Sequence, residues 1–199
     1  MSASLPGTAT RAPARVADWG SAAMSEAVMH TARWSAATQD HADLPFVIVD
    51  KPGAHLYLFD AQARLVAHTP VLLGSAVGDH TVPGIGDKPL ADVLPEERTT
   101  PAGRFHGRMG ENLSGEDVVW VDYDAAVSLH RVRATRASER RLERLASATV
   151  DDNRISYGCI NVPVAFFEAH ILPVFASGSA VIYVLPEKER LEQVFGMLR

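Results

Sequence analysis

The stretch PFVIVDKPGAHLYLFDAQARLVAHTPVLLG, residues 45–74, decides the fold class. It contains three short runs, PFVIVD, AHLYLFD and RLVAHTPVLLG, that are rich in Val, Leu and aromatic residues. The segments KPG and AQA separate these runs, and both carry turn signals. Short apolar runs divided by turn residues predict three successive β-strands that pair antiparallel.

The rest of the chain continues this pattern of short strands and few helices. Further strands are predicted over residues 104–109, 117–123, 125–132 and 179–186. Helices are predicted over residues 16–37, 138–148, 163–171 and 187–198. Residues 78–103 form a loop rich in Gly, Pro and Asp, and so long a loop in a compact domain is more often functional than idle. We therefore predict a mainly β fold with a few short helices, a sandwich or barrel rather than a doubly wound α/β sheet.

Length and composition describe an ordinary globular protein. The 199 residues are 47% hydrophobic and 22% charged, and no apolar run reaches the length of a membrane helix. The formal net charge of -5 argues against nucleic acid or an anionic membrane as the main partner. We predict an N-terminal extension over residues 1–43, disordered at its start and then helical, before a single domain over residues 44–199. The extension shows no apolar stretch of signal-peptide length.

The chain has one cysteine, Cys159, in the segment SYGCIN. A lone thiol excludes an intramolecular disulfide and a multi-cysteine zinc site, and with no metal or cofactor motif in the chain we predict neither. Cys159 is either a small buried hydrophobe or a nucleophile. Its small and polar neighbours favour the nucleophile, since Gly158 permits a sharp turn in which the N–H groups of Gly158 and Cys159 converge on an oxyanion.

A nucleophilic thiol needs a base, and His130 is the best candidate. It ends the alternating run AAVSLHRV, in which Ser128 and His130 share one face of the predicted strand. A histidine at a strand end beside a loop can meet a residue that is distant in sequence, although an ordinary surface histidine would show the same pattern. The rivals for this role are His106, His68 and His80.

Together these residues resemble the signature of the L,D-transpeptidase catalytic domains, the cysteine enzymes of bacterial peptidoglycan. That signature is a histidine, a variable gap, Ser-His-Gly-Cys and, two residues on, Asn or Arg. His130 matches its histidine, and the remainder is matched by Ser156, Gly158, Cys159 and Asn161. The segment TTPAGRF, residues 99–105, resembles the family's Thr-Pro-x-Gly-x-Phe segment. The resemblance covers residues 44–187, in the right order throughout.

The resemblance implies a β-sandwich or barrel holding a Cys–His pair, without metal or cofactor. Cys159 would attack the carbonyl between meso-diaminopimelate and the terminal D-alanine of a tetrapeptide stem, with His130 as base and then acid. The main chain of residues 157–159, which includes Tyr157 and Gly158, would stabilise the oxyanion. The residues expected to contact the substrate are Ser156, Asn161 and Arg131. The thioester would pass to an amine of a second stem peptide or of an envelope lipoprotein, which implies the periplasm or cell envelope.

Three departures from the family pattern concern the site. Tyr157 stands where the family usually has histidine, and Arg131 stands where it often has Gly or Ser. A contact through the Arg131 backbone carbonyl would survive that change. Cys159 follows His130 by 29 positions, and this gap contains an arginine-rich helix that we expect to form a lid or flank over the site. These arginines are either a solvated face or a surface for substrate carboxylates.

Two other functions remain open on the sequence. If water replaced the amine, the protein would be an L,D-carboxypeptidase or endopeptidase of the same family. A non-catalytic envelope module could bind peptidoglycan through the same groove. Retention of the cysteine and the histidine together argues against the binding module, since binding alone does not require a thiol.

Overall fold

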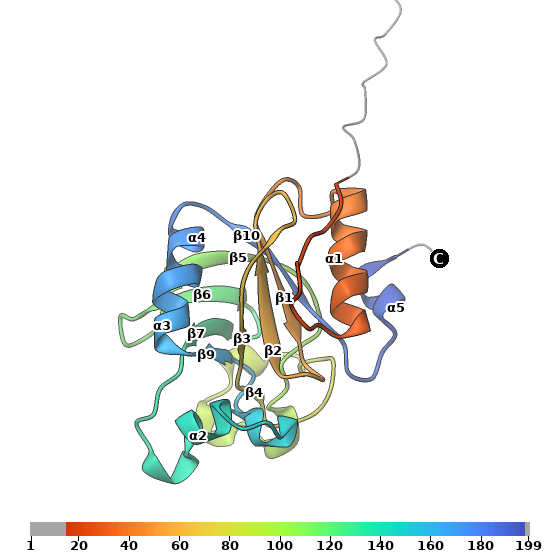
Figure 1. Ribbon diagram of the computed structural model, residues 1–199. Helices are drawn as coiled ribbons and strands as arrows, with labels where there is room; N and C mark the ends of the chain where they lie inside the picture. Colours follow the sequence, from red (N-terminus) through yellow and green to blue (C-terminus); the bar gives the residue numbers. More distant parts are fainter. Residues whose placement is uncertain (1–14, 198–199) are drawn as a thin grey trace, which may run out of the picture.

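The computed structural model describes residues 15–197 and contains one curved sheet of eight strands in the order β3-β2-β1-β10-β5-β6-β7-β9 (Figure 1). One half of the sheet comprises β1 (Phe46–Asp50), β2 (His55–Phe59), β3 (Leu65–Pro70) and β10 (Ala180–Val184). The other half comprises β5 (Gly103–Glu111), β6 (Asp117–Asp122), β7 (Val127–Arg131) and β9 (Ile160–Val162). The predicted antiparallel pairing of the first three strands is confirmed, while β10 pairs parallel with β1 and β9 pairs parallel with β7.

The two edges of this sheet meet, so the sheet is nearly closed into a barrel. After β3 the chain reaches Leu72, whose N–H and C=O each form a 2.9 Å hydrogen bond with the main chain of Asn161 in β9. Next to this contact, β4 (Leu73–Gly74) pairs with β8 (Arg154–Ser156). The mainly β fold with few short helices is therefore confirmed, and the segment before Cys159 is attached to the segment that follows the first three strands.

The inside of the barrel is apolar and is filled by one interrupted helix. This helix consists of α3 (Val164–Phe166), the π-helical segment η6 (Phe167–Ile171) and α4 (Leu172–Ala176). Phe167, Ile171 and Phe175 pack among the Val and Leu side chains of the inner face of the sheet. The helix predicted over residues 163–171 thus continues to Ala176, because Pro173 falls in the first turn of α4, where it needs no N–H partner.

The outer face of β1, β2 and β10 is covered by α1 (Glu26–Thr38), which lies opposite α3 and α4 (Figure 1). Val28, Ala32 and Ala36 of this helix are fully buried against the sheet. The prediction that this helix starts at residue 16 was wrong. It starts at Glu26, where the Ser25 hydroxyl accepts a hydrogen bond from the N–H of Val28 at 3.3 Å.

The other helices are shorter than the sequence predicted. They are α2 (Arg141–Leu145) and α5 (Leu191–Phe195). Short 3-10 turns occupy the long loop and flank α2, at η1 (Ile85–Asp87), η2 (Leu90–Asp92), η3 (Pro95–Glu97), η4 (Ala137–Glu139) and η5 (Val150–Asn153). The predicted disorder at the start of the chain lies outside the described residues. Within residues 15–197, every helix is too short or too polar to traverse a lipid bilayer.

A buried lysine ties four separate segments together at one end of the sheet. Lys51 follows β1, is fully buried, and its Nζ donates to the carbonyls of Gly78 and Thr100 and to Asp79 Oδ1 at 2.6–2.9 Å. Asp79 in turn accepts the N–H groups of residues 187–189, which follow β10. This network fixes the main chain at Thr100, which contacts the loop that carries Cys159.

Candidate active site

The alternation of side chains along β7 and β9 brings the predicted site residues to one face of the sheet. The two strands are parallel, with Leu129 opposite Ile160 and His130 opposite Asn161. Leu129 and Ile160 point into the apolar interior. Successive side chains of a strand point to opposite faces, so His130 and Asn161 lie on the other face. His130 on β7 and Cys159, which directly precedes β9, are therefore brought to neighbouring positions from segments far apart in sequence.

The sulfur of Cys159 lies against the turn and first residues of β7. The Ser128 N–H donates to Sγ at 3.5 Å, and the Ser128 hydroxyl also lies 3.5 Å from Sγ. The thiol itself donates to the carbonyl of Ala126 at 3.6 Å. Cys159 is half-buried. Across the described residues, no hydrogen bond joins Sγ to His130.

Hydrogen bonds on both ring nitrogens define the tautomer of His130. Nδ1 lies 2.7 Å from the carbonyl oxygen of Arg131, which only accepts, so Nδ1 carries the proton. Nε2 lies 3.4 Å from Nδ2 of Asn161, which only donates, so Nε2 accepts. The backbone carbonyl at Arg131 thus orients the imidazole, and the atom left to accept a proton is Nε2.

The environment of His130 favours its neutral form. The pKa of this imidazole is lowered to about 4, chiefly by burial and in addition by the nearby cations Arg133 and Arg141. The Arg131 carbonyl and the carboxylate of Glu116 act in the opposite direction. At pH 7 His130 is therefore neutral, as a general base must be before it takes a proton.

The turn from Ser156 to Cys159 is held by side chains on both sides. The Ser156 hydroxyl donates to the Cys159 carbonyl at 2.6 Å and accepts the Gly158 N–H at 3.1 Å. The Thr100 hydroxyl donates to the Gly158 carbonyl at 2.8 Å and accepts the N–H of Gly74 at 2.9 Å. The segment TTPAGRF therefore supports the cysteine turn directly, through a buried threonine.

Gly158 has a backbone conformation that suits glycine. Its φ is +130°, and a Cβ at this position would lie 2.8 Å from the carbonyl oxygen of Thr99. Because the Gly158 N–H is occupied by Ser156, it is not free to bind an oxyanion in this arrangement. No acceptor among residues 15–197 binds the N–H of Cys159, so this donor is the one that remains at the thiol.

Tyr157 and Arg131 lie at the margins of the site. The Tyr157 ring is 38% exposed and stacks under the guanidinium of Arg98, whose Cζ lies 4.2 Å from the ring centroid. The Arg131 side chain stacks on Phe167 and forms a 2.6 Å ion pair with Glu168. The backbone carbonyl of Arg131, rather than its guanidinium, contacts the candidate base.

Ser156 and Asn161, the other expected substrate contacts, are buried and bonded within the protein. Asn161 Nδ2 donates to the Cys159 carbonyl at 3.2 Å as well as to His130, and its Oδ1 accepts from Arg141 Nη1 at 2.8 Å. Both residues therefore shape the turn and the base in this structure.

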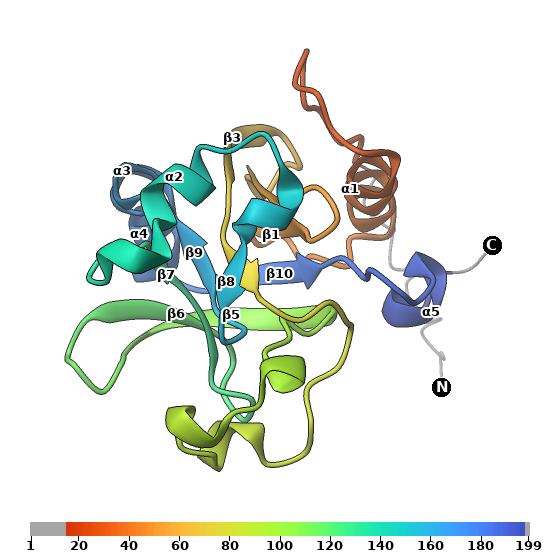
Figure 2. The ribbon, with the colours of Figure 1, turned by 90° about the horizontal axis from the view of Figure 1, so that it is seen from below.

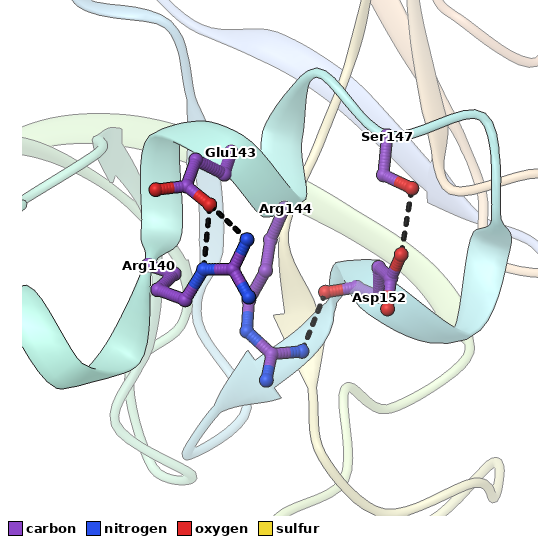
Figure 3. A pocket seen from close by; sticks show the side chains of 5 residues that line it. All are labelled: Arg140, Glu143, Arg144, Ser147 and Asp152. Atoms are coloured by element: carbon purple, nitrogen blue, oxygen red, sulfur yellow. Dashed lines mark hydrogen bonds and ion pairs between the residues drawn. The ribbon is translucent and has the colours of Figure 1, made fainter.

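The arginine-rich segment between β7 and β8 lies beside the site, next to β8 and β9 (Figure 2). Leu145 of α2 packs with Leu72 and Val132 in a small apolar cluster. Most of its arginines pair with acids of the same segment. Figure 3 shows this around a pocket of about 290 Å³, where Arg140 pairs with Glu143 and Arg144 donates to the Asp152 carbonyl. Arg141 also reaches out of the segment, to Asn161.

A second, smaller pocket of about 120 Å³ opens beside the imidazole. It is lined by Glu116, Asp117, His130, Arg131, Val132, Arg133 and Val164. Glu116 and Arg133 form an ion pair across it. Within residues 15–197, no group of three or more His, Cys, Asp or Glu side chains is arranged to hold a metal ion.

The rival histidines are engaged elsewhere. His106 contacts Arg104, His68 contacts His55, and His80 pairs with Glu189. Sequence reasoning placed Ser128 on the face of His130 but gave it no role, although that alternation was the signal for its contact with the sulfur. It missed the bonds of Thr100 and Arg141, because neither a hydroxyl in a loop nor a guanidinium at the start of a helix has a sequence pattern that identifies its partner.

Comparisons with known proteins add a weak likeness to solved structures. No family model matches the sequence, and no curated protein matches it either. A solved structure of LD transpeptidase LdtMt1 in complex with imipenem is 14% identical, with a TM-score of 0.37. The match covers 71% of this chain and 58% of that chain, so this chain spans a little over half of that structure. At this score the likeness defines neither the details of the fold nor an activity.

Proposed function

We propose that this protein is a cysteine acyltransferase of the L,D-transpeptidase type that acts on peptidoglycan stem peptides. The observation that carries the proposal is the arrangement on β7 and β9. Cys159 and His130 share one face, and the Arg131 carbonyl holds His130 in the tautomer whose Nε2 accepts a proton. The motif of residues 156–161 supplies the substrate class through its resemblance to that family.

The reaction would proceed in two balanced steps. His130 Nε2 accepts the thiol proton while Sγ attacks the carbonyl between meso-diaminopimelate and D-alanine, and the Cys159 N–H donates to the oxyanion. The C–N bond then breaks, and His130 returns the proton to the D-alanine amine, which leaves a thioester. An acceptor amine attacks the thioester, its proton passes through His130 to the thiol, and a new amide is formed. Such a substrate places the reaction in the cell envelope.

A non-catalytic peptidoglycan-binding module is the second candidate. It is favoured by one observation, the engagement of Sγ by Ser128 and Ala126 instead of His130. Reactivity separates the two candidates, because a binding module needs no activated thiol.

The test is mass spectrometry of tetrapeptide muropeptides incubated with the wild-type protein and with Cys159→Ala. We expect D-alanine release by the wild type alone, with cross-linked dimers if an amine is the acceptor and tripeptides if water is. His106→Ala serves as the matched histidine control and should retain turnover, whereas His130→Ala should lose it. Unchanged tetrapeptides with every variant would overturn the acyltransferase and favour the binding module.

A further inference from the structure

The arginine-rich segment reaches the candidate base through one chain of hydrogen bonds. Glu139 Oε2 accepts from Arg141 Nε at 2.5 Å, and Arg141 Nη1 donates to Asn161 Oδ1 at 2.8 Å. The amide of Asn161 then donates from Nδ2 to His130 Nε2 at 3.4 Å and to the Cys159 carbonyl at 3.2 Å. Arg141 is well shielded, with a side chain 13% exposed. All of these contacts lie within residues 15–197.

Arg141 anchors the oxygen end of the Asn161 amide. A guanidinium only donates hydrogen bonds, so the amide oxygen must face Arg141 and the amide nitrogen must face His130. Without Arg141, rotation of the amide by half a turn would present Oδ1 to Nε2, where two acceptors would oppose each other. Arg141 and the Cys159 carbonyl, which accepts from Nδ2, therefore fix the orientation of Asn161 together, and Arg141 lies outside the Cys–His motif.

The amide nitrogen occupies the atom that the chemistry needs. A neutral imidazole has one lone pair, on Nε2 in this tautomer, and one lone pair serves one good hydrogen bond. The same lone pair must accept the Cys159 proton in the proposed reaction. Donation by Asn161 and proton transfer from Cys159 are therefore mutually exclusive, and the thiol proton is directed to Ala126 instead.

We propose that Arg141 is a positioning residue that holds the Asn161 amide on His130 Nε2 and so restrains the Cys–His pair until the Arg141–Asn161 contact is broken. The proposal rests on the proposed function, for which it identifies the arginine-rich segment as the restraint. It assigns no contact with substrate to Arg141.

The test compares Arg141→Met with Arg140→Met in the full-length protein. Arg140 is the matched control, because it is adjacent and pairs with Glu143 but does not contact Asn161. The readout is the rate of alkylation by iodoacetamide at pH 7, which reports Cys159 alone because the chain has one cysteine. We expect Arg141→Met to react about five-fold faster, the size set by one released hydrogen bond, and Arg140→Met to match the wild type.

The sign of the effect separates positioning from charge. Removing a cation near a thiol disfavours the thiolate, so loss of charge alone would slow the alkylation. Asn161→Ala should also react faster, and Arg141→Met should add nothing in that background if Arg141 acts through Asn161. Slower alkylation of Arg141→Met, or the same effect with and without Asn161, would overturn the proposal. If Arg141→Met does not fold, Arg141→Lys replaces it in the alkylation test. Lysine keeps the positive charge but lacks the planar guanidinium that reaches Asn161, so faster alkylation is again expected.

The imidazole gives a readout that a merely structural role would not move. The pKa of His130, followed by NMR, should rise from about 4 in Arg141→Lys, which keeps the positive charge that itself lowers this pKa, and stay unchanged in Arg140→Lys. Arg133, Glu116 and the Arg131 carbonyl also face His130 and are unaltered in both variants. Neither readout needs peptide turnover. D-alanine release with unchanged alkylation in Arg141→Met would defeat this inference alone, and faster alkylation without D-alanine release would defeat the proposed function alone.

Discussion

Gly158 carries a φ of +130° and lies against the main chain of Thr99, where a Cβ would come within 2.8 Å of a carbonyl oxygen. At the scale of single residues, this contact lets the turn before Cys159 sit beside the segment that precedes β5. Gly115 also has a positive φ, +74°, but open space surrounds the position of its missing Cβ. A comparison of alanine substitutions at the two glycines therefore separates the free-energy cost of a positive φ from that of the contact with Thr99.

We expect Gly158→Ala to lower the free energy of unfolding by about 2–4 kcal/mol, because strain and overlap with Thr99 add together. Gly115→Ala should cost about 1 kcal/mol, from the positive φ alone. Urea unfolding of both variants measures these values. Equal losses would mean that the turn at Gly158 can relax away from Thr99.

Two histidines make the stability depend on pH. Burial lowers the pKa of both His55 and His130 to about 4, and His68 adds to the effect at His55. Between pH 6.5 and 4 the unfolded chain binds protons at these positions and the folded chain does not, so stability is lost as the pH falls through this window. Each group contributes at most about 1.4 kcal/mol per pH unit.

The test is urea unfolding at pH 7.0, 5.5 and 4.5. We expect the wild type to lose stability across this series and the double variant His55→Gln/His130→Gln to lose clearly less. The comparison concerns the slope with pH, so a constant cost of the substitutions does not affect it. Parallel slopes would show that both imidazoles take up protons normally in the folded state.

At the scale of elements, Thr100 joins two parts of the site. Its hydroxyl connects the N–H of Gly74 in β4 to the carbonyl of Gly158, and all of these atoms are buried. Thr99, next to it, is buried as well, but its hydroxyl forms no hydrogen bond with any described residue. A Thr→Val substitution therefore removes a bridging hydroxyl at Thr100 and a hydroxyl without a hydrogen bond at Thr99.

Thr100→Val should lower the free energy of unfolding by about 2–3 kcal/mol, because it leaves a buried N–H and a buried carbonyl without partners. Thr99→Val should change it by less than about 1 kcal/mol, since the shape is kept and no bond is lost. Chemical unfolding at pH 7 gives both values. A similar small loss in both variants would indicate that water replaces the Thr100 hydroxyl.

Helix ends show why element boundaries were harder to predict than elements. The predicted helix over residues 16–37 merges the real helix with a segment that pairs with the sheet instead, where Asp18 bridges Arg64. The start of α1 is set by the Ser25 cap, a local signal, whereas the pairing of Asp18 depends on a distant strand. In the helix around η6, Pro173 was compatible with continuation because tertiary packing of Phe175 holds the last turn.

At the scale of the whole molecule, Lys51 connects segments that follow β1 and β10 with the long loop and the start of β5. Burial lowers the pKa of Lys51, while its bond with Asp79 acts in the opposite direction. Lys51 remains paired through Asp79 Oδ1 at 2.9 Å, with both side chains almost fully buried. Such a pair contributes little net stability, but removing one partner leaves a buried charge.

We expect Lys51→Met to cost about 3–5 kcal/mol and Lys51→Met/Asp79→Asn to recover part of that loss. Lys88→Met is the control, because Lys88 pairs with Glu97 nearer the surface and should cost less than about 1 kcal/mol. Thermal or urea unfolding ranks the three variants. A double variant as unstable as the sum of its single variants would mean that the two charges do not interact.

The sequence predicted the fold class more completely than it predicted the contacts of the candidate site. Strand periodicity and turn residues are local, so the hairpins of residues 45–74 and the face shared by Ser128 and His130 were readable. The parallel pairing of β9 with β7, which brings Cys159 to that face, joins segments separated by the arginine-rich insertion, and only the motif resemblance suggested it. The hydrogen bonds of Arg141 and Thr100 form only when segments distant in sequence have folded together. The type of a side chain alone does not predict which partner it meets there.

The place of β10 in the middle of the sheet has a consequence for how a cell makes this protein. The strands β3-β2-β1 and β5-β6-β7-β9 are two half-sheets. Residues 180–184 join them on one side, and the contact of Leu72 with Asn161 joins them on the other. While a ribosome synthesises the chain, the joining strand emerges after every other strand of the sheet. Until then the nascent polypeptide presents β1 and β5 as open edges, where strands of other chains can attach. The eight-stranded sheet is therefore incomplete until β10 has emerged, and a factor that shields those edges during translation would prevent such attachment.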